Sequence, residues 1–258
     1  MRDATMLPPN TVPLAPVDRE SWHSYIPSFL PDSDAWVQSL VSSERWERRL
    51  LHVRRRSGRE WVQGHRKWVF QSDDPERVLY RFSGLEFKPE PYSPTMSAFV
   101  RSIRRQLTLN RLEWFNFNSV LMYLYDTPDT YCRNHREDEP ELGHHPAIGY
   151  LGLGDRREFV WSAEMSYEGG LRHDNYKIMW DHGGGDLLVM GGATQERWYH
   201  AVNSADPAAM VGPRIGVLLL NVIPGYHDNG GSLEGGQDYC EESYGGLESS
   251  SGSCFSRY

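Results

Sequence analysis

Residues 147–162 read AIGYLGLGDRREFVWS, two apolar runs separated by a short polar turn. Short runs rich in branched and aromatic residues and bounded by Gly and Asp are typical of buried strands. Further runs of this kind occupy 117–125, 175–180, 186–190, 198–202 and 214–223. Together with 147–153 and 157–162 they predict a β-sandwich or barrel in the second half of the chain.

Helical patterns come before these strands. Asp34 precedes an apolar pattern from Ala35 to Val41 and is a candidate N-cap. Ser93-Pro94 supplies a cap and a first-turn proline for a second helix, whose apolar face is formed by Met96, Phe99, Val100, Ile103 and Leu107. Helices followed by a run of strands indicate the α+β class.

Composition places the chain among globular proteins. Its 258 residues are 39% hydrophobic and 24% charged. Apolar runs stay below the roughly 18 residues that a spanning helix needs, and the N-terminus lacks the order of a secretory signal. Three cysteines at wide spacing, Cys132, Cys240 and Cys254, favour neither a disulfide framework nor a zinc site. We therefore expect an intracellular protein, cytoplasmic or nuclear, that does not interact with membranes.

Three regions differ in texture. Residues 1–20 contain four prolines without apolar periodicity, so we expect an irregular arm. Residues 226–258 hold seven Gly, seven Ser and six acids, a composition that favours a mobile tail. The folded unit is then 21–225.

Charge is distributed unevenly. The formal net charge is −8, but residues 44–105 carry 15 Lys and Arg against 8 Asp and Glu. Aromatic residues alternate with these cations, a mixture that can grip phosphates and stack bases. A solvated basic surface is the simpler interpretation.

The stretch NHREDEP at 134–140 carries candidate metal ligands. Side chains at i and i+2 of an extended chain share a face, so His135 and Glu137 point the same way and Asp138 points away. A second imidazole, His200, lies in the apolar run 198–202. Two His and one carboxylate are the ligand set of non-haem Fe(II) oxygenases, although His-x-Glu alone is a weak signal.

Surrounding motifs make the signal specific. FNSVL at 117–121, HREDE at 135–139, DHG at 181–183, LLVM at 187–190 and the segment from Ala193 to His200 resemble the AlkB family in order and spacing, closest to its eukaryotic DNA- and RNA-repair branches. The resemblance implies a double-stranded β-helix, or jelly roll, with flanking N-terminal helices. It also implies Fe(II) and 2-oxoglutarate as cofactors, O₂ as cosubstrate, and oxidation of a substrate C–H bond.

The resemblance carries over to individual residues. His135 and His200 match the family's histidine ligands, and Glu137 stands where the family has Asp. In the cosubstrate pocket, Arg214 matches the first arginine of the family's Arg-x-Asn-x-Thr-Phe-Arg strand and Tyr125 matches its tyrosine. No catalytic residue beyond the metal ligands is expected.

The cosubstrate pocket departs from the family pattern at three positions. Gly216 and Leu220 replace the Asn and the second Arg, and Tyr123 replaces an Asn. Each lost charge-assisted contact costs roughly 1.5–3 kcal/mol, so we expect weakened or absent use of 2-oxoglutarate.

The substrate side rests on fewer signals. Asp138 matches a family carboxylate that faces a flipped base, Arg157 begins a strand and can reach toward the pocket, and Trp68 belongs to a remnant of the family's recognition lid. His144 and His145 are expected to face solvent.

Three functions fit this sequence. The first is an Fe(II) oxygenase of a small organic molecule with atypical or absent 2-oxoglutarate use, favoured because the changes gather in the active-site shell. The second is a 2-oxoglutarate-dependent dealkylase of nucleobases in DNA or RNA, which would use the basic region 44–105. The third is a catalytically silent AlkB-like binding protein.

Overall fold

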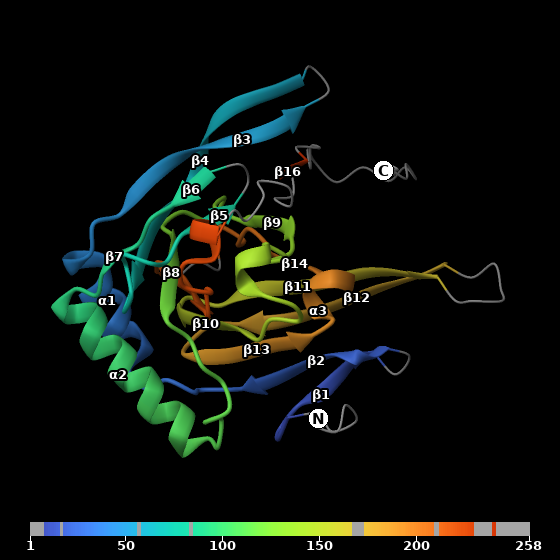
Figure 1. Cartoon of the computed structure of the whole chain (residues 1–258), viewed down its shortest axis with the longest axis horizontal. Helices are drawn as coiled ribbons and strands as arrows, with labels where there is room; N and C mark the ends of the chain where they lie inside the picture. Colours follow the sequence, from blue (N-terminus) through green and yellow to red (C-terminus); the bar gives the residue numbers. More distant parts are fainter. Residues whose placement is uncertain are drawn as a thin grey trace.

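The computed structural model describes residues 8–15, 18–55, 58–82, 85–166, 173–208, 212–229 and 239–240. Most of this chain forms strands, and two longer helices pack along one side (Figure 1). The helices are α1 (Ser33–Ser43), α2 (Pro94–Leu109) and the short α3 (Thr194–Arg197), with 3-10 turns η1 (Pro140–Leu142) and η2 (Tyr226–Asn229). The strands are β1 (Val12–Ala15), β2 (Asp18–Ile26), β3 (Glu47–Arg55), β4 (Gly58–Ser72), β5 (Tyr80–Phe82), β6 (Leu85–Phe87), β7 (Glu90–Pro91), β8 (Ser119–Tyr125), β9 (Cys132–His135), β10 (Ile148–Gly154), β11 (Arg157–Ser166), β12 (His173–His182), β13 (Asp186–Gly192), β14 (Tyr199–Val202), β15 (Arg214–Leu220) and β16 (Tyr239–Cys240).

Eight of these strands form a jelly roll of two facing sheets. The larger sheet contains the order β13-β10-β15-β8, and the smaller sheet has the order β12-β11-β14-β9. Neighbours within both sets are antiparallel, and the chain passes between the sheets after most strands. The predicted α+β class and double-stranded β-helix are confirmed, and all seven predicted strands are present.

β15 shows why these strands read as continuous apolar runs. Leu218 and Leu220 pack in the core between the two sheets, whereas Val217 and Leu219 pack in a second core on the outer face of the large sheet. A strand that is buried on both faces has no polar alternation. Arg214 begins this strand and is completely buried, which makes it an exception that needs partners.

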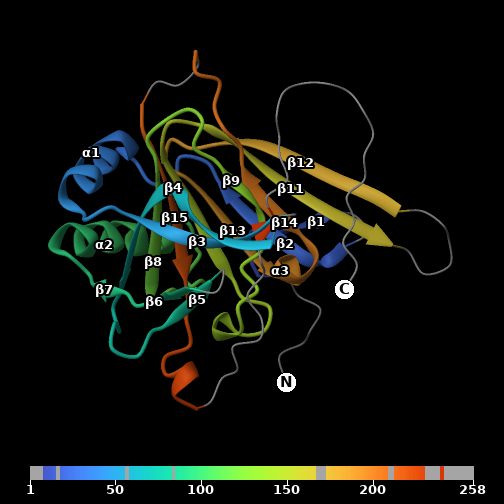
Figure 2. The same ribbon diagram turned by 90° about the horizontal axis from the view of Figure 1, so that it is seen from above.

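The second core lies under the two long helices. α1 and α2 lie beside each other on the outer face of the large sheet (Figure 2). The predicted apolar face of α2 is confirmed, because Met96, Phe99, Val100, Ile103 and Leu107 are all buried. The predicted cap is confirmed as well: the Ser93 hydroxyl accepts the Met96 N–H at 2.9 Å, and Pro94 is the first helical residue.

Ser93→Ala should lower the free energy of unfolding by about 1–2 kcal/mol. The change removes the cap and also the 2.6 Å hydrogen bond that the hydroxyl donates to Glu44. Urea unfolding checks this value. Ser97→Ala, in the helix interior, is the matched control and should be neutral or slightly stabilising, because alanine has the highest helix propensity. Equal effects of the two changes would contradict the capping role.

The expected irregular arm over residues 1–20 is wrong for its described part. Residues 12–15 form β1, which pairs with β2 at Pro13 and Trp22, and β2 in turn pairs with β13. β1 is an edge strand, where a proline can lie without breaking a ladder on both sides. The arm is therefore an extension of the large sheet.

Strands also begin earlier than the sequence suggested. β3 and β4 form a long hairpin that joins the large sheet through pairing of β4 with β8. The many arginines of this hairpin obscure the alternation of polar and apolar residues that would have predicted its strands.

The helix α1 begins at Ser33 and its N-cap residue is Asp32, so the predicted cap Asp34 is wrong by two positions. Asp34 lies in the first turn, where its charge faces the positive end of the helix dipole. The two terminal segments expected to be irregular, 1–7 and most of 226–258, lie outside the described residues.

Within the described residues, every helix is too short or too polar to cross a membrane.

Candidate metal centre

Three predicted ligands meet at one end of the jelly roll. His135 ends β9, His200 lies on the adjacent strand β14, and the two residues are directly paired across the ladder. Glu137 follows β9 and places its carboxylate between the two rings: its two oxygens each lie 2.9 Å from one Nε2 atom. All three residues are buried, and their candidate ligand atoms lie within 4.8 Å of one another.

Charge in this cluster is balanced internally. Burial opposes ionisation of Glu137, but His200 and His135 outweigh it and hold the pKa of this carboxyl well below its usual range. Burial also opposes a charge on His135, yet Cys132 and Glu137 raise the pKa of that imidazole. For His200 burial prevails and the pKa falls. The cluster thus offers an anionic carboxylate and a neutral His200, whereas His135 would have to release its proton when a metal binds.

Neighbouring groups orient the ligands. The Nδ1 of His135 lies 2.8 Å from the Arg133 carbonyl and its Nε2 lies 2.9 Å from Glu137, so each ring nitrogen can donate to an oxygen. The backbone N–H of Glu137 donates to the Gln195 side chain at 3.0 Å. Such contacts fix the tautomer and direction of metal ligands. The residues therefore fit a divalent metal, and the longer Glu in place of Asp still reaches both imidazoles.

Aromatic rings enclose the ligands. The ring of Phe159 stacks on His200 with centroids 5.6 Å apart, and Trp161 meets the same imidazole edge-on at 5.7 Å. Phe82, on the β5–β6 hairpin, meets His135 edge-on at 6.4 Å. Because these rings are buried, they exclude water and lower the local dielectric constant around the ligands.

A second buried carboxyl lies beside the ligands. Glu139 accepts a 3.0 Å hydrogen bond from the Tyr80 hydroxyl, and both residues are buried. Burial and the nearby Glu137 raise the pKa of Glu139 well above its usual range. The sequence interpretation missed Glu139, although the spacing that placed Glu137 on the same face as His135 also places Glu139 there. Asp138 is half-buried between them.

The predicted cosubstrate residues Arg214 and Tyr125 lie together on two neighbouring strands of the large sheet. Arg214 pairs with Tyr125 across β15 and β8, and its guanidinium lies 5.9 Å from the tyrosine ring. This guanidinium donates to the carbonyls of His182 and Asp155 and to Nδ1 of His182. Since Nδ1 accepts from Arg214, His182 is neutral, and burial followed by the Arg214 charge lowers its pKa.

Side chains of the protein itself pack around the three positions that depart from the family pattern. A Cβ on Gly216 would lie 2.5 Å from the Tyr150 hydroxyl, so the tyrosine occupies the space of a larger side chain. Leu220 is completely buried among apolar residues. Tyr123 lies edge-on against Trp68 at 4.8 Å. A second guanidinium, that of Arg157, lies 6.0 Å from the Tyr125 ring.

Two predicted substrate residues are placed inside the protein. Arg157 is buried and donates to the carbonyls of Thr127, Pro128 and Thr130, so it fastens the β8–β9 loop. Trp68 is 3% exposed and stacks on Phe87 with centroids 4.9 Å apart. Both positions lie beneath the surface, and neither side chain is presented to solvent.

The basic region is only partly visible, because the side chains of residues 49–66 lie outside the described set. Five of the nine described Lys and Arg side chains form ion pairs with acids; these pairs are Arg45–Glu47, Lys67–Asp126, Arg77–Asp74, Arg81–Glu86 and Arg104–Asp73. The other four, Arg48, Lys88, Arg101 and Arg105, are exposed. The aromatic side chains Trp68, Phe70, Tyr80 and Phe82 are buried.

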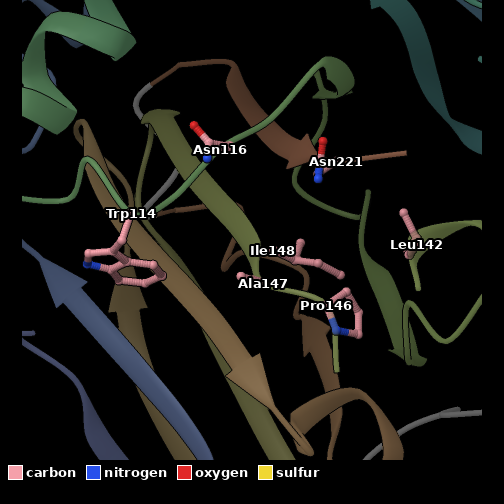
Figure 3. A pocket seen from close by; sticks show the side chains of 7 residues that line it. All are labelled: Trp114, Asn116, Leu142, Pro146, Ala147, Ile148 and Asn221. Carbon is pink, nitrogen blue, oxygen red and sulfur yellow. The ribbon is translucent and has the colours of Figure 1, made fainter. Parts of the chain in front are cut away.

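A separate cavity of about 200 Å³ lies near the start of β10 (Figure 3). It contains none of the predicted site residues. Its walls come from Trp114, Asn116, Leu142, Pro146, Ala147, Ile148 and Asn221.

Comparison with known proteins agrees with this geometry. The profile of the 2OG-Fe(II) oxygenase superfamily matches residues 23–219. DNA oxidative demethylase ALKBH2 of Bos taurus is 28% identical over 57% of this chain and 50% of its own length. Alpha-ketoglutarate-dependent dioxygenase alkB homolog 3 of Homo sapiens is 32% identical over 56% of this chain and 49% of its own.

A plant relative matches over a longer stretch. DNA oxidative demethylase ALKBH2 of Arabidopsis thaliana is 27% identical over 77% of this chain and 66% of its own length. The chain spans about half the length of the two mammalian relatives. The profile match covers most of the chain, the predicted resemblance is confirmed, and the chain belongs to the 2OG-Fe(II) oxygenase superfamily and, within it, to the AlkB family.

Proposed function

We propose that this protein is a non-haem Fe(II)-dependent oxygenase that oxidises a C–H bond of a small organic molecule, with atypical or absent use of 2-oxoglutarate. The buried triad of His135, Glu137 and His200, enclosed by aromatic rings, is the observation that carries the proposal. His135, Glu137 and His200 would hold Fe(II), which would supply the activation of O₂.

The remaining residues prepare this centre. The Arg133 carbonyl and the Gln195 side chain orient two of the ligands, so little rearrangement is needed when the metal binds. Phe82, Phe159 and Trp161 exclude water. Apolar rings around a small polar centre suit a substrate with an aromatic or alicyclic body.

Cosubstrate use is atypical or absent in this proposal. Arg214 already donates to two carbonyls and to His182, and Leu220 replaces a cation. A keto acid would have to displace these internal contacts, at a cost of roughly 1–3 kcal/mol for each buried group left unpaired. Without a keto acid, the reaction balances if the substrate supplies all four electrons that O₂ requires, for example by accepting both oxygen atoms.

A second candidate is oxidative dealkylation of a nucleobase. The Tyr80–Glu139 pair beside the triad favours it, because a hydroxyl and a carboxyl next to aromatic rings can recognise a heterocycle. Two of the relatives that match this chain in sequence are named DNA oxidative demethylase. The exposed cations Arg48, Lys88, Arg101 and Arg105 are available for phosphate contact, whereas Lys67 and Arg104 are paired with acids.

Oxygen uptake by the Fe(II)-loaded protein discriminates between these candidates. We expect uptake with aromatic or alicyclic metabolites, little dependence on 2-oxoglutarate, and a weak charge-transfer band when 2-oxoglutarate is added anaerobically. Uptake with alkylated single-stranded oligonucleotides that requires 2-oxoglutarate would establish the dealkylase instead. His200→Ala is the negative control. No uptake with any substrate, from a protein that binds iron, would indicate a silent binding protein.

A further inference from the structure

A second group of metal-ligating side chains lies on the surface, apart from the buried triad. The Nδ1 of His144 lies 3.3 Å and the Nε2 of His145 lies 3.1 Å from the same oxygen, Oε1 of Glu196. The ligand atoms of all three residues lie within 4.8 Å of one another, and the three side chains are exposed. We propose that these residues form a second site for a divalent transition metal of the zinc, nickel or copper class.

The backbone explains how adjacent histidines can serve one site. Neighbouring side chains of an extended chain point to opposite faces. His145 adopts a left-handed conformation with φ of 53°, and the two imidazoles stack with centroids 3.8 Å apart, both on the Glu196 carboxylate. A positive φ is unfavourable for residues other than glycine, and exposed His–Glu pairs contribute little stability in return. Coordination of a metal would supply the stabilisation that offsets the unfavourable backbone conformation of His145.

The ligand set indicates the class of metal. Two imidazoles and one carboxylate suit zinc, nickel and copper, whereas magnesium and calcium prefer sets made of oxygen atoms. Because the side chains are exposed, water can complete the coordination sphere and the ligands need little desolvation. The site should therefore bind reversibly, with an affinity that depends on all three residues.

Its position would connect the two segments that carry the buried triad. His144 and His145 lie in the loop between β9, which ends at His135, and β10. Glu196 lies in α3, which directly precedes β14 and His200, and its neighbour Gln195 accepts the Glu137 N–H. A metal bound on the surface would fasten the loop to α3 and so stabilise the frame of the triad.

Zinc binding to the tag-free chain tests the proposal. Calorimetric titration should show two zinc ions per wild-type chain, and one for either His145→Ala or Glu196→Gln, with at least tenfold weaker binding at the altered site. His200→Ala should also bind one ion, and its combination with His145→Ala should bind none. Glu113→Gln, an exposed acid elsewhere, is the matched control and should bind two.

The pattern separates this proposal from the proposed function. If the buried triad does not bind zinc but the surface site does, wild type and His200→Ala should each bind one ion, and His145→Ala should bind none. Equal zinc binding by wild type, His145→Ala and Glu196→Gln would overturn the surface site. Thermal unfolding gives a second readout: zinc should raise the melting temperature of His200→Ala, which retains only the surface site, but not of its His145→Ala double variant.

Discussion

Replacing His200 with alanine should abolish stoichiometric Fe(II) binding. The change removes one of two imidazoles whose Nε2 atoms converge on Glu137. Loss of a group that merely orients a ligand already weakens metal affinity by about 10- to 100-fold, so loss of a ligand should cost at least about 100-fold. Anaerobic titration with ferrous iron, followed by desalting and iron analysis, measures this effect.

A histidine elsewhere in the interior provides the control. His23 lies on β2 in the large sheet, half-buried against Trp180 with ring centroids 4.8 Å apart, and is not one of the three clustered ligands. His23→Ala should keep one iron per chain even if it lowers stability slightly. If His200→Ala retains iron as wild type does, the ligands are wrongly assigned. If both variants lose iron, unfolding must be checked by circular dichroism before the result is assigned to coordination.

Gly192→Ala should be among the most destabilising single substitutions in the chain. Gly192 ends β13 with φ of 64°, and an added Cβ would lie 1.9 Å from the Glu20 carbonyl oxygen. The left-handed conformation costs roughly 1–2 kcal/mol for a residue with a Cβ, and overpacking typically adds about 1–3 kcal/mol. We expect the free energy of unfolding to fall by about 2–5 kcal/mol.

The effect should reach the metal centre, because this junction fixes α3. The Ala193 N–H donates to the Glu20 carbonyl at 2.9 Å, and the Thr194 hydroxyl donates to the Gly191 carbonyl at 2.6 Å. His200 follows a few residues later. Guanidinium unfolding measures the loss of stability. Gly212→Ala is the matched control, since its Cβ would meet no atom within 4 Å, and it should be neutral or slightly stabilising. Equal midpoints for the two variants would contradict the packing at Gly192.

The strands could be predicted from local pattern, whereas the metal ligands were predicted chiefly from the resemblance of the surrounding motifs to the AlkB family. Strands buried on both faces read as apolar runs, and the spacing of His135 and Glu137 placed both on one face, in agreement with their 2.9 Å contact. β3 and β4 escaped prediction because arginines interrupt their alternation. β1 escaped because Pro13 suggests a turn, and only its place at the edge of the sheet makes it a strand.

Long-range contacts account for the rest of the site. The sequence indicates that Arg214 is inside, but its partners, the carbonyls of His182 and Asp155, come from distant turns. Nothing local shows that Tyr150 fills the space beside Gly216. Burial of Trp68 and of Phe82 depends on the packing of the β5–β6 hairpin over the jelly roll. The sequence periodicity does not predict this packing.

The most direct test of the metal centre is iron K-edge X-ray absorption on the anaerobic Fe(II)-loaded chain. Coordination by His135, Glu137 and His200 predicts a first shell of nitrogen and oxygen atoms, with outer-shell scattering from two imidazoles that falls to one in His135→Ala if residual iron is retained. Scattering from sulfur, or an iron shell without imidazole, would contradict this ligand set and with it the proposed oxygenase.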